Sequence, residues 1–190
     1  MVPWPTVDIL QVLEEDHRAI KEAFHNIVTV PTCRHADAFW ALIELLVRHE
    51  VAEEAVVYPA LRKIPGGPKI ADARVAEHSE VLGTVHVLDK LDRTSVEFSA
   101  ELDFLHQAVL EHAQGEQSEV FPLLLWHDRP QRNRLGERYQ AAKRSALRCT
   151  SPLDTRSGNL RVGSVAALVE VLRGVANGIL TKAWVNVADS

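Results

Sequence analysis

The 190-residue chain lacks the sequence features that are typical of disulfide-rich, nucleic-acid-binding and membrane-spanning proteins. Cys33 and Cys149 are its only cysteines, too few for a disulfide framework, so we expect reduced thiols. Its 26 acidic residues outnumber its 21 basic ones, and the net charge of -5 argues against nucleic-acid binding. It has no uncharged apolar run of 18 residues either, so no membrane span is predicted.

The N-terminal segment also lacks the order of a signal peptide, which is basic first and then apolar. Here Asp8, Glu14, Glu15 and Asp16 follow the opening Met-Val-Pro-Trp-Pro. We therefore expect a cytoplasmic protein.

What the chain does contain is apolar residues spaced three and four apart, a spacing typical of helices. The spacing predicts four long helices, at residues 6–30, 37–63, 69–91 and 96–126. Short breaks separate them, and Ser95 or Thr94 is expected to cap the last of the four. Four such helices with short connections predict an all-α fold, an antiparallel up-down four-helix bundle.

The composition changes after residue 130, and we divide the chain into a bundle at 1–130 and a tail at 131–190. Residues 131–148 are strongly basic, with a thin apolar stripe formed by Leu135, Tyr139, Ala142 and Ala146. Residues 163–180 predict an additional, amphipathic C-terminal helix. We expect the tail to pack on the bundle or on a partner chain. Its basic stretch is expected to be a solvated helix face, with contact to a partner or an anionic surface as the alternative.

Two stretches 63 residues apart share one pattern, a histidine followed by a glutamate after four residues and a proline after ten. The residues are His49, Glu53 and Pro59, and then His112, Glu116 and Pro122. A single histidine lies on the helix before each stretch, at His17 and His78. All six histidines and glutamates of the pattern fall on the predicted apolar faces, near the middle of their helices.

Metal coordination is the chemistry that this pattern predicts. A single histidine on an apolar face is more often a hydrogen-bonded core residue, but six donors with repeated spacing on four faces favour a metal. Residues four apart lie on one helical face, and facing helices of a bundle can hold two ions between them. Two free carboxylates in an apolar core would be costly, and coordination removes that objection.

Imidazole combined with carboxylate favours iron over calcium or magnesium, with manganese or zinc as alternatives. We expect Glu53 and Glu116 to bridge two ions. His17 and His49 are expected to hold one ion, and His78 and His112 the other.

The order of these residues resembles the hemerythrin-like HHE cation-binding domain over about residues 8–127. The residues that carry the resemblance are His17, His49-x3-Glu53, His78, His112-x3-Glu116, Tyr58-Pro59 and Phe121-Pro122. The resemblance implies a four-helix bundle with a non-haem di-iron centre and an oxo or hydroxo bridge. The family includes oxygen carriers, sensors, nitric-oxide-related repair proteins and a mycobacterial subgroup linked to peroxide breakdown. The length and the basic, then helical, tail most resemble that subgroup.

One departure from the oxygen carriers favours redox chemistry. They have two histidines four apart on the third helix, whereas here Leu82 stands four residues after His78. One ligand fewer leaves one more open coordination position, which suits reaction with a small oxidant. We therefore predict catalase-like turnover of hydrogen peroxide. The alternatives are a module that binds or senses dioxygen or nitric oxide, and an iron-handling protein. A monomer or homodimer is expected, without nucleic-acid or membrane partners.

Several neighbours of the pattern are candidates for supporting roles. Glu119, three residues after Glu116 on the predicted core stripe, is a candidate catalytic proton donor and acceptor, or else a carboxylate paired with an arginine. Tyr58 and Phe121 are expected to pack off the main stripe, with a hydroxyl beside the metal as the alternative for Tyr58. Pro59 is expected to bend its helix just past the site.

The remaining polar neighbours are expected to be peripheral. Glu50 and Glu54 are expected to be solvated or to support the ligands. The histidines outside the pattern are not expected to be ligands, and His35, His106 and His127 are expected at the surface.

Overall fold

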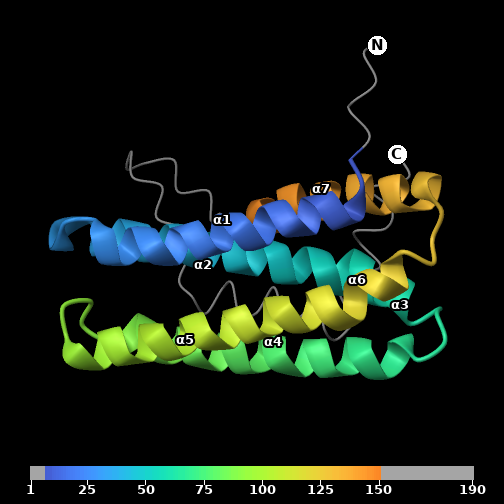
Figure 1. Ribbon diagram of the computed structural model, residues 1–190. Helices are drawn as coiled ribbons and strands as arrows, with labels where there is room; N and C mark the ends of the chain where they lie inside the picture. The colour runs from blue at the N-terminus through green and yellow to red at the C-terminus, as the bar shows by residue number, and fades with distance from the viewer. Residues whose placement is uncertain (1–6, 151–190) are drawn as a thin grey trace, which may run out of the picture.

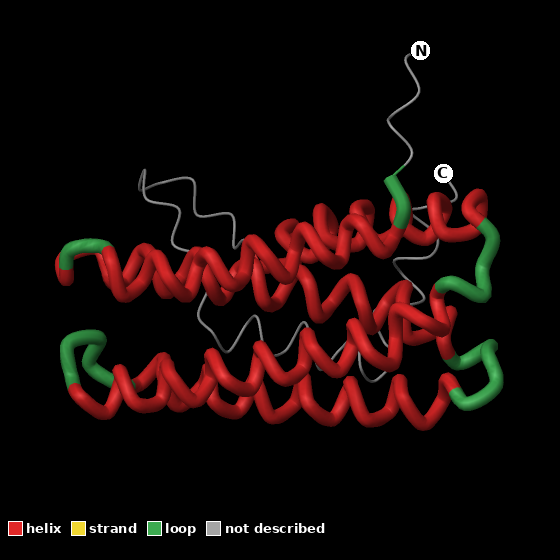
Figure 2. The backbone as a smooth tube through the Cα atoms, viewed as in Figure 1, coloured by secondary structure: helices red, strands yellow, loops and turns green. Residues whose placement is uncertain are grey.

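The computed structural model describes residues 7–150, and within this range the chain consists of helices joined by short loops, without a strand (Figure 1, Figure 2). Four long helices run antiparallel: α1 (Ile9–Thr29), α2 (His35–Ala52), α4 (Gly67–Lys90) and α5 (Val96–Gly115). A short 3-10 turn, η1 (Thr32–Arg34), joins α1 to α2. The predicted all-α bundle is confirmed, whereas the helix expected at 163–180 lies outside the described residues.

The helix starts follow from local side-chain chemistry. Asp8 caps α1 by accepting a hydrogen bond from the backbone N–H of Leu10 at 3.1 Å. Ser95 caps α5 in the same way, as expected, and accepts from the N–H of Phe98 at 3.0 Å. The turn before α4 contains Gly66 at φ 81°, a left-handed conformation that favours glycine.

Each helix that carries the repeated pattern contains a π-helical turn that the apolar spacing did not predict. α2 passes through η2 (Glu53–Val57) into α3 (Tyr58–Leu61). α5 passes through η3 (Glu116–Val120) into α6 (Phe121–Leu124). A proline follows each π turn by two residues, at 59 and 122. Proline has no N–H and clashes with the carbonyl four residues earlier, and the wider π turn accommodates both problems.

The π turns rotate the residues that follow them, because a π turn uses about one residue more than an α turn. Tyr58 is thereby turned into the core, where it is fully buried, and Val120 is buried in the other helix. Glu119, by contrast, has a side chain that is 51% exposed. The predictions that Glu119 lies on the core stripe and that Tyr58 lies off it are therefore wrong. The helices also change from α to π geometry at Glu53 and Glu116 themselves, whereas a bend was expected only past the site, at the prolines.

The core consists of two apolar halves with a polar layer between them. One half includes Ile20, Leu46 and Leu105, and the other includes Leu13 and Val57. Along each of the four bundle helices, the chain passes from residues of one apolar half to residues of the other. The histidines and glutamates of the pattern lie where this change occurs. Burying carboxylates in such a layer is costly unless they are paired or coordinated.

A fifth long helix, α7 (Arg129–Thr150), lies along α1 and α2 (Figure 1). Its predicted apolar stripe is buried: Leu135, Tyr139, Ala142 and Ala146. Gly136 permits the close approach to the start of α1, since a Cβ there would lie 2.1 Å from the carbonyl oxygen of Val7. The described part of the tail thus packs on the bundle. Within residues 7–150, no helix is long and apolar enough to cross a membrane.

Candidate metal centre

The six side chains of the repeated pattern meet in the middle of the bundle. Their donor atoms form two groups, within each of which the atoms lie within 4.8 Å of one another. The first group contains His17, His49, Glu53 and Glu116, and the second contains Glu53, His78 and His112. Each long helix of the bundle, or the π turn that continues it, contributes at least one donor, and Glu53 belongs to both groups.

The two glutamates are oriented toward histidines of both groups. Glu53 places Oε1 at 3.2 Å from Nε2 of His49 and Oε2 at 3.3 Å from Nε2 of His78. Glu116 places Oε2 at 3.1 Å from Nε2 of His17 and at 3.8 Å from Nε2 of His112. Both carboxylates are fully buried. This is the orientation that a carboxylate shared between two cations requires.

The outer ring nitrogens of two histidines are held by carboxylates. Nδ1 of His78 lies 3.1 Å from Oε1 of Glu54, and Nδ1 of His112 lies 2.8 Å from Oε2 of Glu77. Because an ionised carboxylate only accepts hydrogen bonds, each Nδ1 carries the proton. In the neutral rings Nε2 then presents a lone pair to the centre, the arrangement found around metal-bound histidines.

These inward nitrogens also lie close to each other, with Nε2 of His78 3.3 Å from Nε2 of His112. Two lone pairs at this distance repel unless a positive charge lies between or beside them. The donor set therefore fits a metal cation.

Protons take the place of cations in the metal-free protein. Burial alone would lower the pKa of His112, but hydrogen bonds to Glu53 and Glu77 outweigh burial and raise the pKa to about 9. Burial likewise opposes ionisation of Glu53, but the charge of His49 and hydrogen bonds with His112 and His78 hold its pKa well below 4.5. Without metal, a protonated His112 beside an ionised Glu53 is therefore favoured.

A pH dependence of stability follows for the metal-free protein. Because the pKa of His112 rises from 6.5 to about 9 on folding, its contribution is complete below pH 6.5 and is lost as the pH rises through 9. We expect the midpoint of thermal unfolding to fall by roughly 5 °C between pH 6.5 and 9. Calorimetry of chelator-treated protein measures this change. In the metal-loaded protein His112 is neutral, so the same pH range should leave the midpoint nearly constant, and equal slopes for both forms would contradict the assignment.

Tyr58 adds a hydroxyl to the centre. Its oxygen lies 3.1 Å from Nε2 of His78, 3.1 Å from Oε1 of Glu116 and 3.3 Å from Oε2 of Glu53. Burial first, and then the charges of the two glutamates, raise the pKa of Tyr58 well above 10, so the phenol is protonated in the metal-free protein. At the matching position of the repeat, Phe121 stacks on His17 with ring centroids 6.2 Å apart. Of these two matching positions in the repeat, residue 58 therefore supplies a hydroxyl and residue 121 does not.

Tyr139 on α7 also reaches the centre, and nothing in the sequence indicated this. Nδ1 of His49 donates a hydrogen bond to the Tyr139 hydroxyl at 2.7 Å. The hydroxyl in turn donates to Oδ2 of Asp16 at 2.8 Å, and Lys143 pairs with the other oxygen of Asp16. Tyr139 is 90 residues from His49 and lies in a basic segment, so only tertiary packing reveals the contact.

Replacing Tyr139 with phenylalanine should weaken both folding and metal binding. The loss would leave a buried ring N–H of His49 without its partner, at a cost of about 1–3 kcal/mol in the free energy of unfolding. Removing the group that orients a metal ligand is expected to lower metal affinity by roughly 10–100-fold. Denaturant unfolding and competition with a chromophoric chelator measure the two effects. The exposed neighbour Arg138→Gln is the control, and a Tyr139→Phe variant with its metal affinity unchanged would contradict the role.

The predicted role of Glu119 finds no support in the geometry. Its carboxylate is half exposed and lies 3.5 Å from Nη2 of Arg74, which also pairs with Glu77 at 2.9 Å. The arginine-paired alternative is thus what the structure shows. Since Glu77 holds His112, Glu119 lies at the outer end of a chain of polar contacts and not among the donors.

A small cavity of about 30 Å³ adjoins the donors. His17, His49 and His112 are among the residues that line it, and most of the other lining residues are apolar, including Ile20 and Leu46. Such a volume has room for one or a few molecules the size of water. The donors therefore adjoin a partly enclosed space that suits a small reactant.

Glu50 also lines this cavity, although we expected it to be solvated or to support the ligands. It is 3% exposed, and its Oε2 has no hydrogen-bond partner in the part of the chain that the structure describes. Burial raises its pKa to about 7. A carboxyl group with this pKa can hold or release a proton at neutral pH. His106, expected at the surface, is partly buried and lines the cavity as well.

A four-helix bundle with a layer of histidine and glutamate donors defines a metal-binding protein of the hemerythrin type. The family model described as the hemerythrin HHE cation binding domain matches residues 8–124. The chain therefore belongs to the hemerythrin HHE cation-binding family, as its donor pattern indicated.

Two relatives support this assignment. An uncharacterised hemerythrin-like protein of Schizosaccharomyces pombe is 27% identical over 122 residues, which cover 63% of this chain and 60% of that protein. The chain thus matches well under two thirds of the length of this relative. A crystal structure of a hemerythrin HHE cation binding domain-containing protein from Mycobacterium kansasii, described as an Rv2633c homolog, superposes with a TM-score of 0.69 at 25% identity. The match covers 87% of this chain and 99% of that one.

Proposed function

We propose that this protein holds two iron ions in the polar layer of its bundle and uses them to break down hydrogen peroxide into dioxygen and water. The observation that carries the proposal is the small cavity that places the Glu50 carboxyl beside three donor histidines. A cation-binding bundle needs only the donors. A partly enclosed space of about 30 Å³ with a carboxyl group that holds a proton near pH 7 suits a reaction of a small molecule.

The ligand set favours iron and an open coordination position. One ion would be held by His17 and His49, the other by His78 and His112, and Glu53 and Glu116 would lie between them. Nitrogen and carboxylate ligands of this kind suit iron, with manganese or zinc as alternatives. When bound, the iron pair would supply the capacity to take two electrons from one peroxide and return them to another, so that two H₂O₂ give O₂ and two H₂O.

The chain's own residues supply proton handling and exclusion of water. Cleaving the O–O bond consumes protons, and oxidising the second peroxide releases them. Glu50 is the buried carboxyl group in the cavity wall that can exchange a proton near neutral pH. The position four residues after His78 is Leu82, an apolar residue packed against the core, which leaves a site for a reactant in place of a further histidine.

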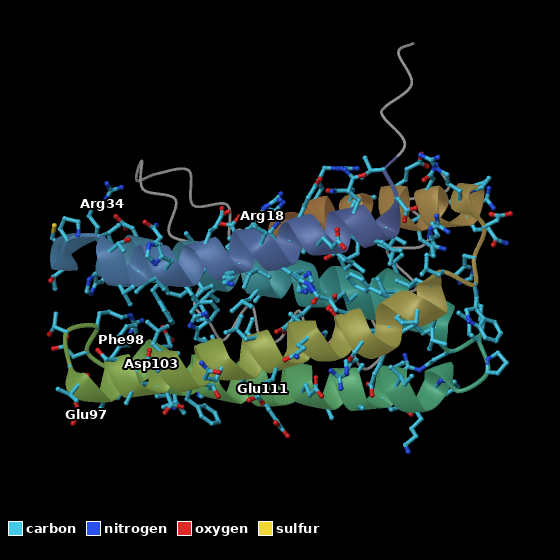
Figure 3. All side chains as sticks on the ribbon, viewed as in Figure 1. Arg18, Arg34, Glu97, Phe98, Asp103 and Glu111 are labelled. Carbon is cyan, nitrogen blue, oxygen red and sulfur yellow. The ribbon has the colours of Figure 1, made fainter. Side chains whose placement is uncertain are left out.

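Dioxygen release measured with an oxygen electrode tests the proposal. Iron-loaded protein should release one O₂ for every two peroxides consumed, well above an equal concentration of free iron. Glu50→Gln should retain its iron but lose roughly 100-fold in rate, the usual contribution of a general acid–base group. Glu111→Gln, on the exposed surface of α5 (Figure 3), is the control. Peroxide breakdown no faster than with free iron would overturn the proposal.

Binding of dioxygen or nitric oxide is the second candidate. The mainly apolar lining of the cavity favours it, because apolar walls suit uncharged diatomic molecules. A stable, reversible adduct of the reduced protein without turnover of peroxide would support this function instead.

A further inference from the structure

A wider groove lies on the outside of the bundle between α1 and α5. It has a volume of about 580 Å³ and is bordered by charged residues that include Arg18 on α1 and Asp103 on α5, both labelled in Figure 3. The smaller, partly enclosed cavity at the candidate metal centre also lies between these two helices, with further walls from α2 and α4. We call the line along which α1 and α5 meet the seam. The groove lies at the outer side of this seam and the cavity at its inner side.

Three residues line both spaces: Lys21, Phe24 and His106. The rings of Phe24 and His106 are stacked, with centroids 4.5 Å apart and planes inclined by 20°. Phe24 comes from α1 and His106 from α5, so the stacked pair crosses the seam. Any molecule that passes from the groove to the cavity along this seam meets these two rings.

The two rings are held unequally. Phe24 is 3% exposed and belongs to the apolar core, so its position is fixed by packing. His106 is partly buried, and its Nε2 has no hydrogen-bond partner among residues 7–150. The ring of His106 stacks on Phe24, and an aromatic stack of this kind is a weak restraint. The imidazole is the ring that can move without breaking a hydrogen bond.

We propose that the seam between α1 and α5 is the route by which small molecules reach the metal centre, and that Phe24 and His106 select them by size. The inference rests on the proposed function in that the centre must react with a small molecule. The apolar wall inside the rings, which includes Ile20, Leu46 and Val109, disfavours charged reactants. The route admits uncharged molecules of the size of hydrogen peroxide or smaller and excludes bulky hydroperoxides.

Single-turnover kinetics of the full-length, iron-loaded chain test this selection. The reduced centre is mixed with hydrogen peroxide or with tert-butyl hydroperoxide, and its oxidation is followed by absorbance. His106→Ala should accelerate the reaction with tert-butyl hydroperoxide by about tenfold or more, the scale on which a steric wall discriminates. The rate with hydrogen peroxide should change less than about twofold. His106→Phe keeps a ring of similar size and should retain the selectivity of the natural protein.

Two further measurements complete the test. Val28→Ala alters a residue that lines the outer groove alone and should leave both rates unchanged. The association rate of nitric oxide, a readout of access that needs no turnover, should be similar in all variants. His106→Val provides the same test with a smaller void if the alanine variant loses its metal.

The outcomes separate the route from the proposed function. An unchanged ratio of the two hydroperoxide rates in both the alanine and valine variants would overturn the route. A changed ratio in a protein that does not release dioxygen from peroxide would uphold the route and overturn the proposed function.

Discussion

Replacing Glu53 with alanine should release both metal ions, whereas replacing His17 should release only one. Glu53 is the one residue that belongs to both donor groups, while His17 belongs to the first group alone. If the natural protein holds two irons, as proposed, we expect close to none in Glu53→Ala and about one in His17→Ala, because each ion needs its full set of ligands. Elemental analysis after dialysis gives the stoichiometry directly.

The control for this experiment is Glu80→Ala, an exposed glutamate on α4. It should bind as much metal as the natural protein. Equal losses in Glu53→Ala and His17→Ala would show that the two groups do not act as separate sites. Full retention of iron in Glu53→Ala would remove the basis of the metal assignment.

Removing α7 should prevent the bundle from folding cooperatively. The helix buries Leu135, Tyr139 and two alanines against α1 and α2, and its loss would expose the apolar residues beneath. Each large buried side chain stabilises the fold by about 1.5–3 kcal/mol, while the whole free energy of unfolding of a domain is about 5–15 kcal/mol. A chain ending at residue 128 is therefore expected to lose its sharp thermal transition, as measured by circular dichroism.

A matched variant separates the apolar face of α7 from its charges. Arg134→Gln combined with Arg138→Gln alters the exposed face of the helix and leaves the buried stripe intact. It should unfold like the natural protein. A truncated chain that unfolds cooperatively and binds two irons would instead make residues 1–130 an independent domain, as the change in composition predicted.

The bundle could be predicted from the sequence because its helices bury residues spaced three and four apart. That spacing placed the four long helices, and Ser95 was correctly expected to cap α5. The π turns could not be predicted, because a single added residue leaves the spacing on either side almost unchanged. Tyr58 and Glu119 were misplaced for this one reason: the apolar stripe was extended through each π turn as if it were α-helical.

The candidate metal centre could be predicted only where it depends on the spacing of residues along a single helix. Histidines and glutamates four apart lie on one helical face, so the six donors were placed by sequence alone. Partners from distant segments could not be placed in this way. Tyr139 comes from another helix, and Glu77 and Glu54 are ordinary acidic residues until the fold brings them to Nδ1 of a histidine.

The paired π turns have a consequence for comparing relatives of this protein. Each turn amounts to one inserted residue, placed between the pattern glutamate and the proline that follows it by six. A relative that lost one residue from this interval would return to a regular α-helix, and the residues after it would keep their direction, because the π turn is what accommodates the added residue. Sequence alignments should therefore show one-residue gaps in this interval for relatives with a regular helix, and the aromatic residue before the proline should face the polar layer in both kinds of chain.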